Sequence, residues 1–301
     1  MIPAPPNKEV QAYLDYLRFE KRYALTTLES YASDLNFLFL FLKEQYECEG
    51  LTDIQAPMIR GWLASMKELG HSSKSINRRI SAVKSFYRFL LRKGCVATNP
   101  AALLVAPKIG KRLPVYVEKK DMETLFSHVT FPEGWKGSVE RMVFMLFYAT
   151  GMRLSELTGL KQEQVDMSRR QLKILGKGNK ERFIPIGEEL YQNLEAYIKE
   201  RNTMLPEGET PFLLVHETGK PLHPRHVQTV IKKYLEMVTT IEKKSPHVLR
   251  HSFATHLMNN GADLNAVKAL LGHSSLAATQ VYTHNTIEKL KDIHAKAHPK
   301  S

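Results

Sequence analysis

The sequence predicts a mainly α-helical protein of two domains, the second of which contains a small antiparallel β-sheet. Apolar residues recur every three or four positions along most of the chain, which is typical of helices that pack by one face. Residues 106–114, rich in proline, glycine and cations, interrupt this pattern. With 301 residues, of which 43% are hydrophobic, the chain can bury two cores. We therefore expect one domain over residues 1–108, ending in a basic linker, and a second over residues 109–301.

Four helices are predicted in the first domain. Each has an apolar face, and the second is expected to open with a capping box formed by Thr26 and Glu29. Pro57 suits the first turn of the third helix, and Gly70 marks its end. The four helices are expected near residues 10–17, 28–42, 57–70 and 73–92.

The fourth of these helices combines an apolar side with a cationic side. At about 100° per residue, six polar residues fall within one stripe opposite the apolar ones. No Asp or Glu lies between Lys74 and Lys93, whereas a solvated helix face, the alternative interpretation, usually mixes acids with bases. Arginine, lysine and serine along one face suit the phosphates and bases of a DNA groove. The predicted DNA-binding residues are Lys74, Arg78, Ser81, Ser85, Arg88 and Arg92.

Charge and composition favour a polyanionic partner. The chain has 43 Lys and Arg against 31 Asp and Glu, a formal net charge of +12. This favours nucleic acid over an acidic membrane surface, the alternative being ordinary surface charge. Cys48 and Cys95 form no CxxC pair, so neither a disulfide framework nor a zinc–thiolate site is predicted. No export signal or membrane span is recognisable, and we expect a cytoplasmic protein with no membrane partner.

The second domain is expected to be helical around one β-hairpin. Residues 171–175 and 182–186 are predicted strands joined by the turn GKGNKE, and residues 212–215 are a predicted third strand. Helices are expected near residues 121–129, 139–150 and 155–160, from Ser245 onward, and over residues 264–271.

Two cations of this domain occupy local structures that favour anion contacts. Arg153, in TGMRLSEL, follows a glycine turn at the start of a predicted helix, and its guanidinium could hold two phosphate oxygens. The alternative is a surface ion pair with Glu156. Lys177 lies between two glycines at the hairpin tip, where a lysine could protonate a leaving oxygen, although such turns are often merely structural. Lys180 is the nearest alternative for that role.

The segment SPHVLRH places His247, Arg250 and His251 on adjoining turns of one predicted helix, with Ser245 as its N-cap. Three cation-capable groups there repel one another unless an anion lies among them. A metal site is the alternative, because His247 and His251 have the spacing of zinc-binding helices. However, Val248 replaces the expected glutamate and Arg250 would oppose a cation, so no metal is predicted.

His273 and Tyr282 complete the candidate set. His273 follows Gly272, which is expected to end the helix over residues 264–271, and Tyr282 alone would more often be a half-buried core residue. A phenol has a pKa near 10 and needs nearby cations to attack at neutral pH. Five cation-capable side chains and one phenol could hold a phosphodiester and attack it without a metal. The catalytic candidates are Arg153, Lys177, His247, Arg250, His273 and the nucleophile Tyr282.

In their order and spacing, these motifs resemble those of the tyrosine recombinases, in particular the XerC/XerD-type site-specific recombinases, over nearly the whole chain. The resemblance implies an N-terminal four-helix SAM-like core-binding domain and a C-terminal mixed α+β catalytic domain. It assigns the six candidates to the active site and leaves His251 and His256 as structural residues. The implied reaction is attack of Tyr282 on DNA to form a 3'-phosphotyrosine, while a 5'-hydroxyl leaves with a proton from Lys177. Neither ATP nor any cofactor is required.

The resemblance also implies partners. These are a double-stranded DNA recombination site, a homo- or hetero-tetramer with a partner Xer-type recombinase, and an FtsK-like translocase. The implied role is to resolve chromosome dimers at a dif-like sequence during cell division. A mobile-element integrase, a type IB topoisomerase and, from a different class, a non-catalytic architectural DNA-binding protein are the alternatives. Residues 287–297 carry a short apolar stripe that we expect to dock on a neighbouring protomer, or alternatively on their own domain.

Overall fold

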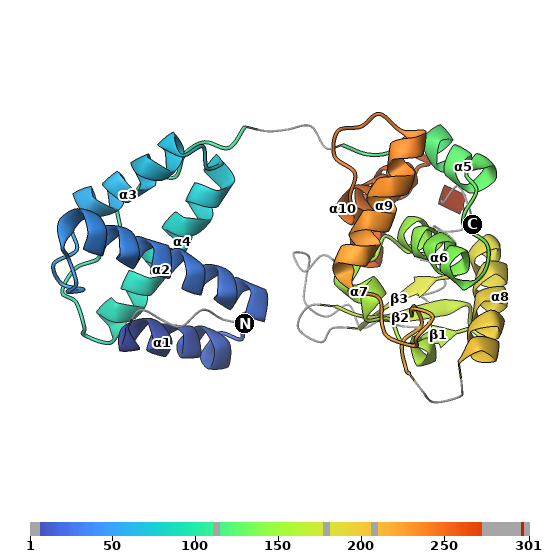
Figure 1. Ribbon diagram of the computed structural model, residues 1–301, viewed down its shortest axis with the longest axis horizontal. Coiled ribbons are helices and arrows are strands. Elements are labelled where there is room, and N and C mark those ends of the chain that lie inside the picture. The colour runs from blue at the N-terminus through green and yellow to red at the C-terminus, as the bar shows by residue number, and fades with distance from the viewer. Residues whose placement is uncertain (1–6, 111–114, 177–180, 206–209, 273–295, 298–301) are drawn as a thin grey trace. The chain divides into compact units, whose positions relative to one another are not determined.

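The computed structural model in Figure 1 describes residues 7–110, 115–176, 181–205, 210–272 and 296–297. The chain divides into two compact units, Met1–Arg112 and Leu113–Ser301, and each is considered by itself. The boundary that the sequence places after residue 108 stays a prediction.

The first unit contains the four predicted helices. They are α1 (Lys8–Asp15), α2 (Leu25–Tyr46), α3 (Ala56–Glu68) and α4 (Ser73–Arg92). Asn7 and Ser72 cap α1 and α4 by accepting hydrogen bonds from the amides of Val10 and Ser75. A π-helical turn, Tyr16–Glu20, extends α1. The apolar sides of these helices form one core, so the helical periodicity of the sequence identifies the buried faces correctly.

The capping box predicted for α2 is wrong. The helix begins at Leu25 after the N-cap Ala24, so Thr26 lies inside the first turn. There the Thr26 carbonyl accepts a hydrogen bond from the Ser30 hydroxyl. A capping side chain must belong to the residue that precedes the helix, and Thr26 is too late in the chain to serve.

The second unit is organised around α6 (Trp135–Thr150), which is buried on almost all sides. Helix α6 packs against α7 (Leu154–Thr158), α8 (Glu188–Met204), α9 (Pro224–Val238) and α10 (Pro246–Asn259). Two more helices are α5 (Lys119–His128) and α11 (Leu264–Leu271). The apolar patterns of the sequence predict α5, α6, α7, α10 and α11, whereas α8 and α9 are not predicted. Among the residues that the structure describes, no helix is both long and apolar enough to cross a bilayer.

The sheet has three antiparallel strands in the order β1 (Val165–Asp166), β2 (Gln171–Leu175) and β3 (Glu181–Pro185). The predicted hairpin is confirmed, with Leu172 opposite Ile184 and Ile174 opposite Arg182. Its two strands turn Leu172, Ile174 and Ile184 into the core.

The third strand predicted over residues 212–215 is wrong, because β1 takes that place beside β2. Phe212 and Val215 form only isolated bridges, to Lys161 and Pro221. The buried guanidinium of Arg201 donates hydrogen bonds to the carbonyls of Phe212 and Thr210. Two nitrogens of Arg201 donate to the Phe212 carbonyl and use both of its lone pairs, so this carbonyl has none left for a neighbouring strand. The segment remains a core-facing loop.

Near the chain end, Ala297 is 3% exposed and belongs to the core of its own domain. The side-chain amide of Asn260 donates a hydrogen bond of 2.6 Å to the Ala297 carbonyl. A contact of this kind is expected if the chain end docks on its own domain. From the sequence we favour docking on a neighbouring protomer, with docking on the same domain as the alternative. Residues 287–295 lie outside the described part of the chain.

Candidate active site

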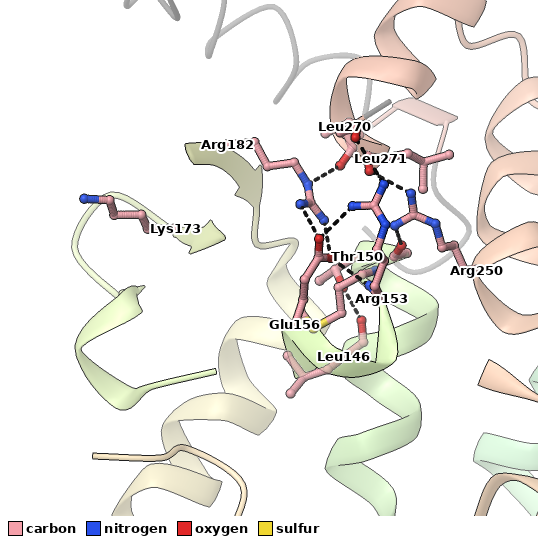
Figure 2. Close-up of polar contacts among 12 residues, drawn as sticks. Leu146, Thr150, Arg153, Glu156, Lys173, Arg182, Arg250, Leu270 and Leu271 are labelled. Atoms are coloured by element: carbon pink, nitrogen blue, oxygen red, sulfur yellow. Dashed lines mark hydrogen bonds and ion pairs between the residues drawn. The ribbon is translucent and has the colours of Figure 1, made fainter. Parts of the chain in front are cut away.

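Three of the six catalytic candidates, Arg153, His247 and Arg250, lie in the described part of the second unit. Lys177, His273 and Tyr282 lie outside it. The structure brings Arg153 and Arg250 together with two residues that the sequence analysis does not place in the site itself, Glu156 and Arg182 (Figure 2). We call these four residues the arginine–glutamate cluster.

Arg250 projects from α10 into the protein and is 7% exposed. Its guanidinium donates hydrogen bonds of 2.7 Å to the carbonyls of Gly151 and Leu271, which lie at the C-terminal ends of α6 and α11. Carbonyls at these ends carry partial negative charge and so suit a buried cation. Burial lowers the pKa of Arg250 to about 10, with the neighbouring Arg153 acting in the same direction. Arg250 therefore stays charged at neutral pH and joins two helix ends.

Arg153 is the N-cap residue of α7, and its side chain is 38% exposed. One guanidinium nitrogen lies 2.8 Å from Glu156 Oε1, and the other donates a 3.2 Å hydrogen bond to the Gly272 carbonyl. The backbone amide of Arg153 donates to Glu156 Oε2 at 2.7 Å. The ion pair with Glu156 is present, but Glu156 is nearly buried, so the pair is not the exposed one that the alternative interpretation expects. The exposed part of the Arg153 guanidinium is therefore accessible to an external anion.

Glu156 is the only carboxylate of the arginine–glutamate cluster, and its side chain is 5% exposed. The two terminal nitrogens of Arg182 donate to its two oxygens at 2.9 and 2.8 Å. Burial by itself would raise the pKa of Glu156, but the hydrogen bonds from Arg182 and from the Arg153 amide lower it to about 2. Three guanidinium groups against one carboxylate leave the cluster with excess positive charge, which suits a phosphodiester and its transition state.

From the sequence, Arg182 is predicted only as a strand residue, with no role in the site. Its side chain is 3% exposed and lies on the same side of β3 as the buried Ile184. A charged residue at the core-facing position of a short apolar strand is the signal that could have identified it, because burying an unpaired charge is costly.

The beginning of α10 differs from its predicted form. Ser245 is the N-cap residue, but its hydroxyl forms no capping bond, and the Val248 amide bonds to the Ser245 carbonyl at 2.9 Å instead. His247 is exposed in the first turn and His251 is half-buried, whereas Arg250 turns inward. His256 is buried, with its Nδ1 2.9 Å from the Tyr148 hydroxyl, a contact of the core rather than of the cluster. Within the described ranges, no group of three His, Cys, Asp or Glu residues could hold a metal ion.

In the first unit, α4 buries its apolar side and exposes the predicted DNA-binding stripe. Lys74, Arg78, Ser81, Arg88 and Arg92 are exposed, and Ser85 is half-buried. Some of these side chains also have partners within the unit. Arg78 lies 2.5 Å from the buried carboxylate of Asp34, and Arg92 donates to the Tyr16 hydroxyl at 2.7 Å.

The double substitution Lys74→Ala/Arg88→Ala should reduce the salt dependence of DNA binding. Each phosphate contact that is lost lowers the slope of log affinity against log salt by about 0.9, so the slope should flatten by about two if both residues contact phosphates. Binding is measured by fluorescence anisotropy over a salt series. Lys120→Ala/Lys232→Ala, two exposed lysines of the second unit, is the control with the same change in net charge. If the two double variants show equal slopes of log affinity against log salt, Lys74 and Arg88 do not contact phosphates and the stripe is a solvated helix face.

Comparison with known proteins agrees with this architecture. Residues 116–289 match the phage integrase family, and residues 10–94 match its N-terminal SAM-like domain. The chain is 37% identical to the tyrosine recombinase XerC of Chlorobaculum parvum, covering 96% of this chain and 94% of that protein. It is also 37% identical to the XerC of Mycobacterium sp. (strain JLS), covering 97% and 99%.

Solved structures of more distant proteins share the fold. XerH site-specific recombinase bound to a palindromic difH substrate has a TM-score of 0.71 at 20% identity, covering 94% of this chain and 82% of that one. The Tn1549 transposon integrase in complex with transposon right end DNA has a TM-score of 0.69 at 21% identity, covering 94% and 98%.

A helical SAM-like domain, followed by a largely α-helical domain with a three-stranded sheet, is the fold class that the sequence predicts, and it is confirmed. The second domain carries the arginine–glutamate cluster, and its sequence matches a family of enzymes that cleave and rejoin DNA. The chain belongs to the phage integrase family, the tyrosine recombinases.

Proposed function

We propose that this protein is a Xer-type site-specific recombinase whose reaction is carried by Arg153, Lys177, His247, Arg250, His273 and Tyr282. The Tyr282 oxygen attacks a DNA phosphorus, the bond to the 5'-oxygen breaks, and a 3'-phosphotyrosine forms. Lys177 supplies the proton that turns the departing oxygen into a 5'-hydroxyl. The ester keeps the free energy of the broken bond, so a 5'-hydroxyl from another strand can reverse the reaction and reseal the DNA.

The arginine–glutamate cluster is the observation that supports this proposal. A buried Arg250 and a half-exposed Arg153 are held by fixed partners before any DNA arrives, so little reorganisation is needed when charge develops on the phosphate. The same positive field lowers the free energy of the Tyr282 phenolate, whose pKa near 10 would otherwise keep it protonated.

The biological role that we propose is resolution of chromosome dimers at a dif-like sequence during cell division. The support is likeness over the full length to proteins named XerC and likeness in fold to XerH bound to difH. In this role the protein works in the cytoplasm on double-stranded DNA, as a tetramer with itself or with a partner Xer-type recombinase, and an FtsK-like translocase brings the sites together. A mobile-element integrase is the second candidate, supported by the fold likeness to the Tn1549 integrase.

Sequencing of DNA trapped covalently on the protein in cells tests the proposal. We expect one chromosomal site made of two inverted half-sites, and purified protein should recombine two copies of it in EDTA. Recovery of the ends of a mobile element would instead identify an integrase. Relaxation of supercoiled plasmid without recombinant products would identify a topoisomerase, and absence of any adduct would leave an architectural DNA-binding protein.

A further inference from the structure

Arg182 links its own strand to two segments that are far apart in the sequence. It belongs to β3, its Nε donates a 2.8 Å hydrogen bond to the Leu270 carbonyl near the end of α11, and its two terminal nitrogens hold the Glu156 carboxylate of α7. The side chain is 3% exposed, so all of these contacts are shielded from water. Every nitrogen of this guanidinium therefore donates to a fixed partner.

The position of Arg182 is not explained by packing. On the buried side of the hairpin its neighbours are Ile174, directly across, and Ile184, two residues along β3. An apolar side chain would fill that position without the cost of removing a guanidinium from water. An arginine there suits a site that needs a planar fork to hold a carboxylate by both oxygens while a third donor contacts a carbonyl.

The contacts of Glu156 show what this fork controls. Oε1 accepts from the guanidiniums of both Arg153 and Arg182, and Oε2 accepts from Arg182 and from the Arg153 amide. The direction of the Arg153 guanidinium thus depends on the orientation of Glu156, which Arg182 fixes from the opposite side. Arg182 also lies close to Gly272, where an added Cβ would come within 3.1 Å of its Cδ. Gly272 has a φ of +65°, a second reason for glycine there.

We infer that Arg182 is a positioning residue for DNA cleavage, which keeps Glu156 ionised and oriented so that Glu156 presents Arg153 to the scissile phosphate. Through the Leu270 carbonyl, Arg182 also ties the hairpin to the end of α11. Hence the strand after the Lys177 turn and the helix before His273 are held by one guanidinium. The inference rests on the proposed function, because it takes Arg153 as a ligand of the phosphate.

Arg182→Met and Arg182→Lys test this inference on a nicked suicide duplex that carries the recovered recombination site. Methionine is apolar and can occupy the buried position, and lysine keeps the charge but cannot hold both carboxylate oxygens and a carbonyl in one plane. For a residue that acts through another, we expect cleavage by the Met variant to fall at least about tenfold at neutral pH, with DNA affinity almost unchanged. The Lys variant should cleave at an intermediate rate.

A pH profile separates positioning from a purely structural role. The charged groups that face Glu156 are Arg153, Arg182 and Arg250. Without Arg182, burial still favours the neutral carboxyl while the strongest opposing hydrogen bond is lost, so the pKa of Glu156 rises. Cleavage by the Met variant should therefore decline further as the pH falls towards about 5, whereas the wild type should show no such added decline. The double variant Arg182→Met/Glu156→Gln should also lack it.

Each outcome decides the matter. A Met variant with wild-type rate and pH profile, or a Lys variant with full activity, would overturn the inference. The inference would also be overturned if the Met variant lost activity only in proportion to its loss of folded protein, measured by circular dichroism, and kept the wild-type pH profile. If the Met variant does not fold, the rate and pH profile of the Lys variant decide alone. Wild-type protein that forms no adduct would reject the proposed function instead, so the two failures are distinguishable.

Discussion

Tyr282→Phe is expected to abolish covalent attachment to a nicked suicide site while leaving binding of that site intact. The substitution removes the one oxygen that can form the ester and leaves the ring in place. The adduct is measured as a slowly migrating labelled band on a denaturing gel, and binding is measured by native gel shift. A Phe variant that still forms the adduct would place the nucleophile elsewhere.

Tyr234 provides the matched control for this substitution. Tyr234 is the tyrosine of the described residues nearest to Tyr282 in the sequence, but it is only 1% exposed, and its hydroxyl donates a hydrogen bond to Glu140. Burial and the Glu140 carboxylate both raise the pKa of Tyr234, the opposite of what an attacking phenolate needs. Tyr234→Phe should keep the adduct and lose about 1–3 kcal/mol of stability, because Glu140 loses a buried partner.

Arg250→Ala should reduce cleavage by on the order of a hundredfold or more, the scale of removing one preorganised charge donor. The substitution also leaves the carbonyls of Gly151 and Leu271 without their buried partner, so some loss of stability should accompany it. Single-turnover cleavage and denaturant unfolding are measured on the same preparation.

Arg201→Ala separates the two effects. Arg201 is also a buried arginine of the second unit, 6% exposed, and it too donates to backbone carbonyls, those of Thr210 and Phe212. None of its recorded partners belongs to the arginine–glutamate cluster. The Arg201 variant should be destabilised like the Arg250 variant, yet its folded fraction should cleave normally. If both variants lose cleavage only in proportion to stability, Arg250 has a structural role alone.

Local patterns in the sequence predict much of the fold. The bounds of α4 follow from its apolar periodicity, and the hairpin follows from two apolar runs around a Gly-rich turn. The third strand is mispredicted because the backbone of residues 212–215 bonds elsewhere in the fold: the Phe212 carbonyl accepts from Arg201 of α8, and the Leu213 amide donates to the Leu160 carbonyl. No local pattern contains that information.

The candidate site shows the same limit. Arg153 and Arg250 are identifiable because each lies in a short motif with a local reason to bind an anion. The role of Arg182 depends on partners 26 and 88 residues away, Glu156 and Leu270, which only the folded chain brings together. Likewise, the exposed stripe of α4 can be predicted from the sequence. The contact of Arg78 with Asp34 cannot be predicted, because it joins two helices.

Mass spectrometry of the trapped wild-type adduct determines which residue attacks the DNA. Protein incubated with the suicide duplex in EDTA is digested with trypsin and nuclease, and the modified peptide is sequenced. We expect one modified peptide, with the phosphate at a 3' DNA end esterified to the Tyr282 oxygen and a free 5'-hydroxyl on the released strand. Attachment at another residue, linkage to a 5' end, or an adduct that forms only when a divalent metal is restored would contradict it.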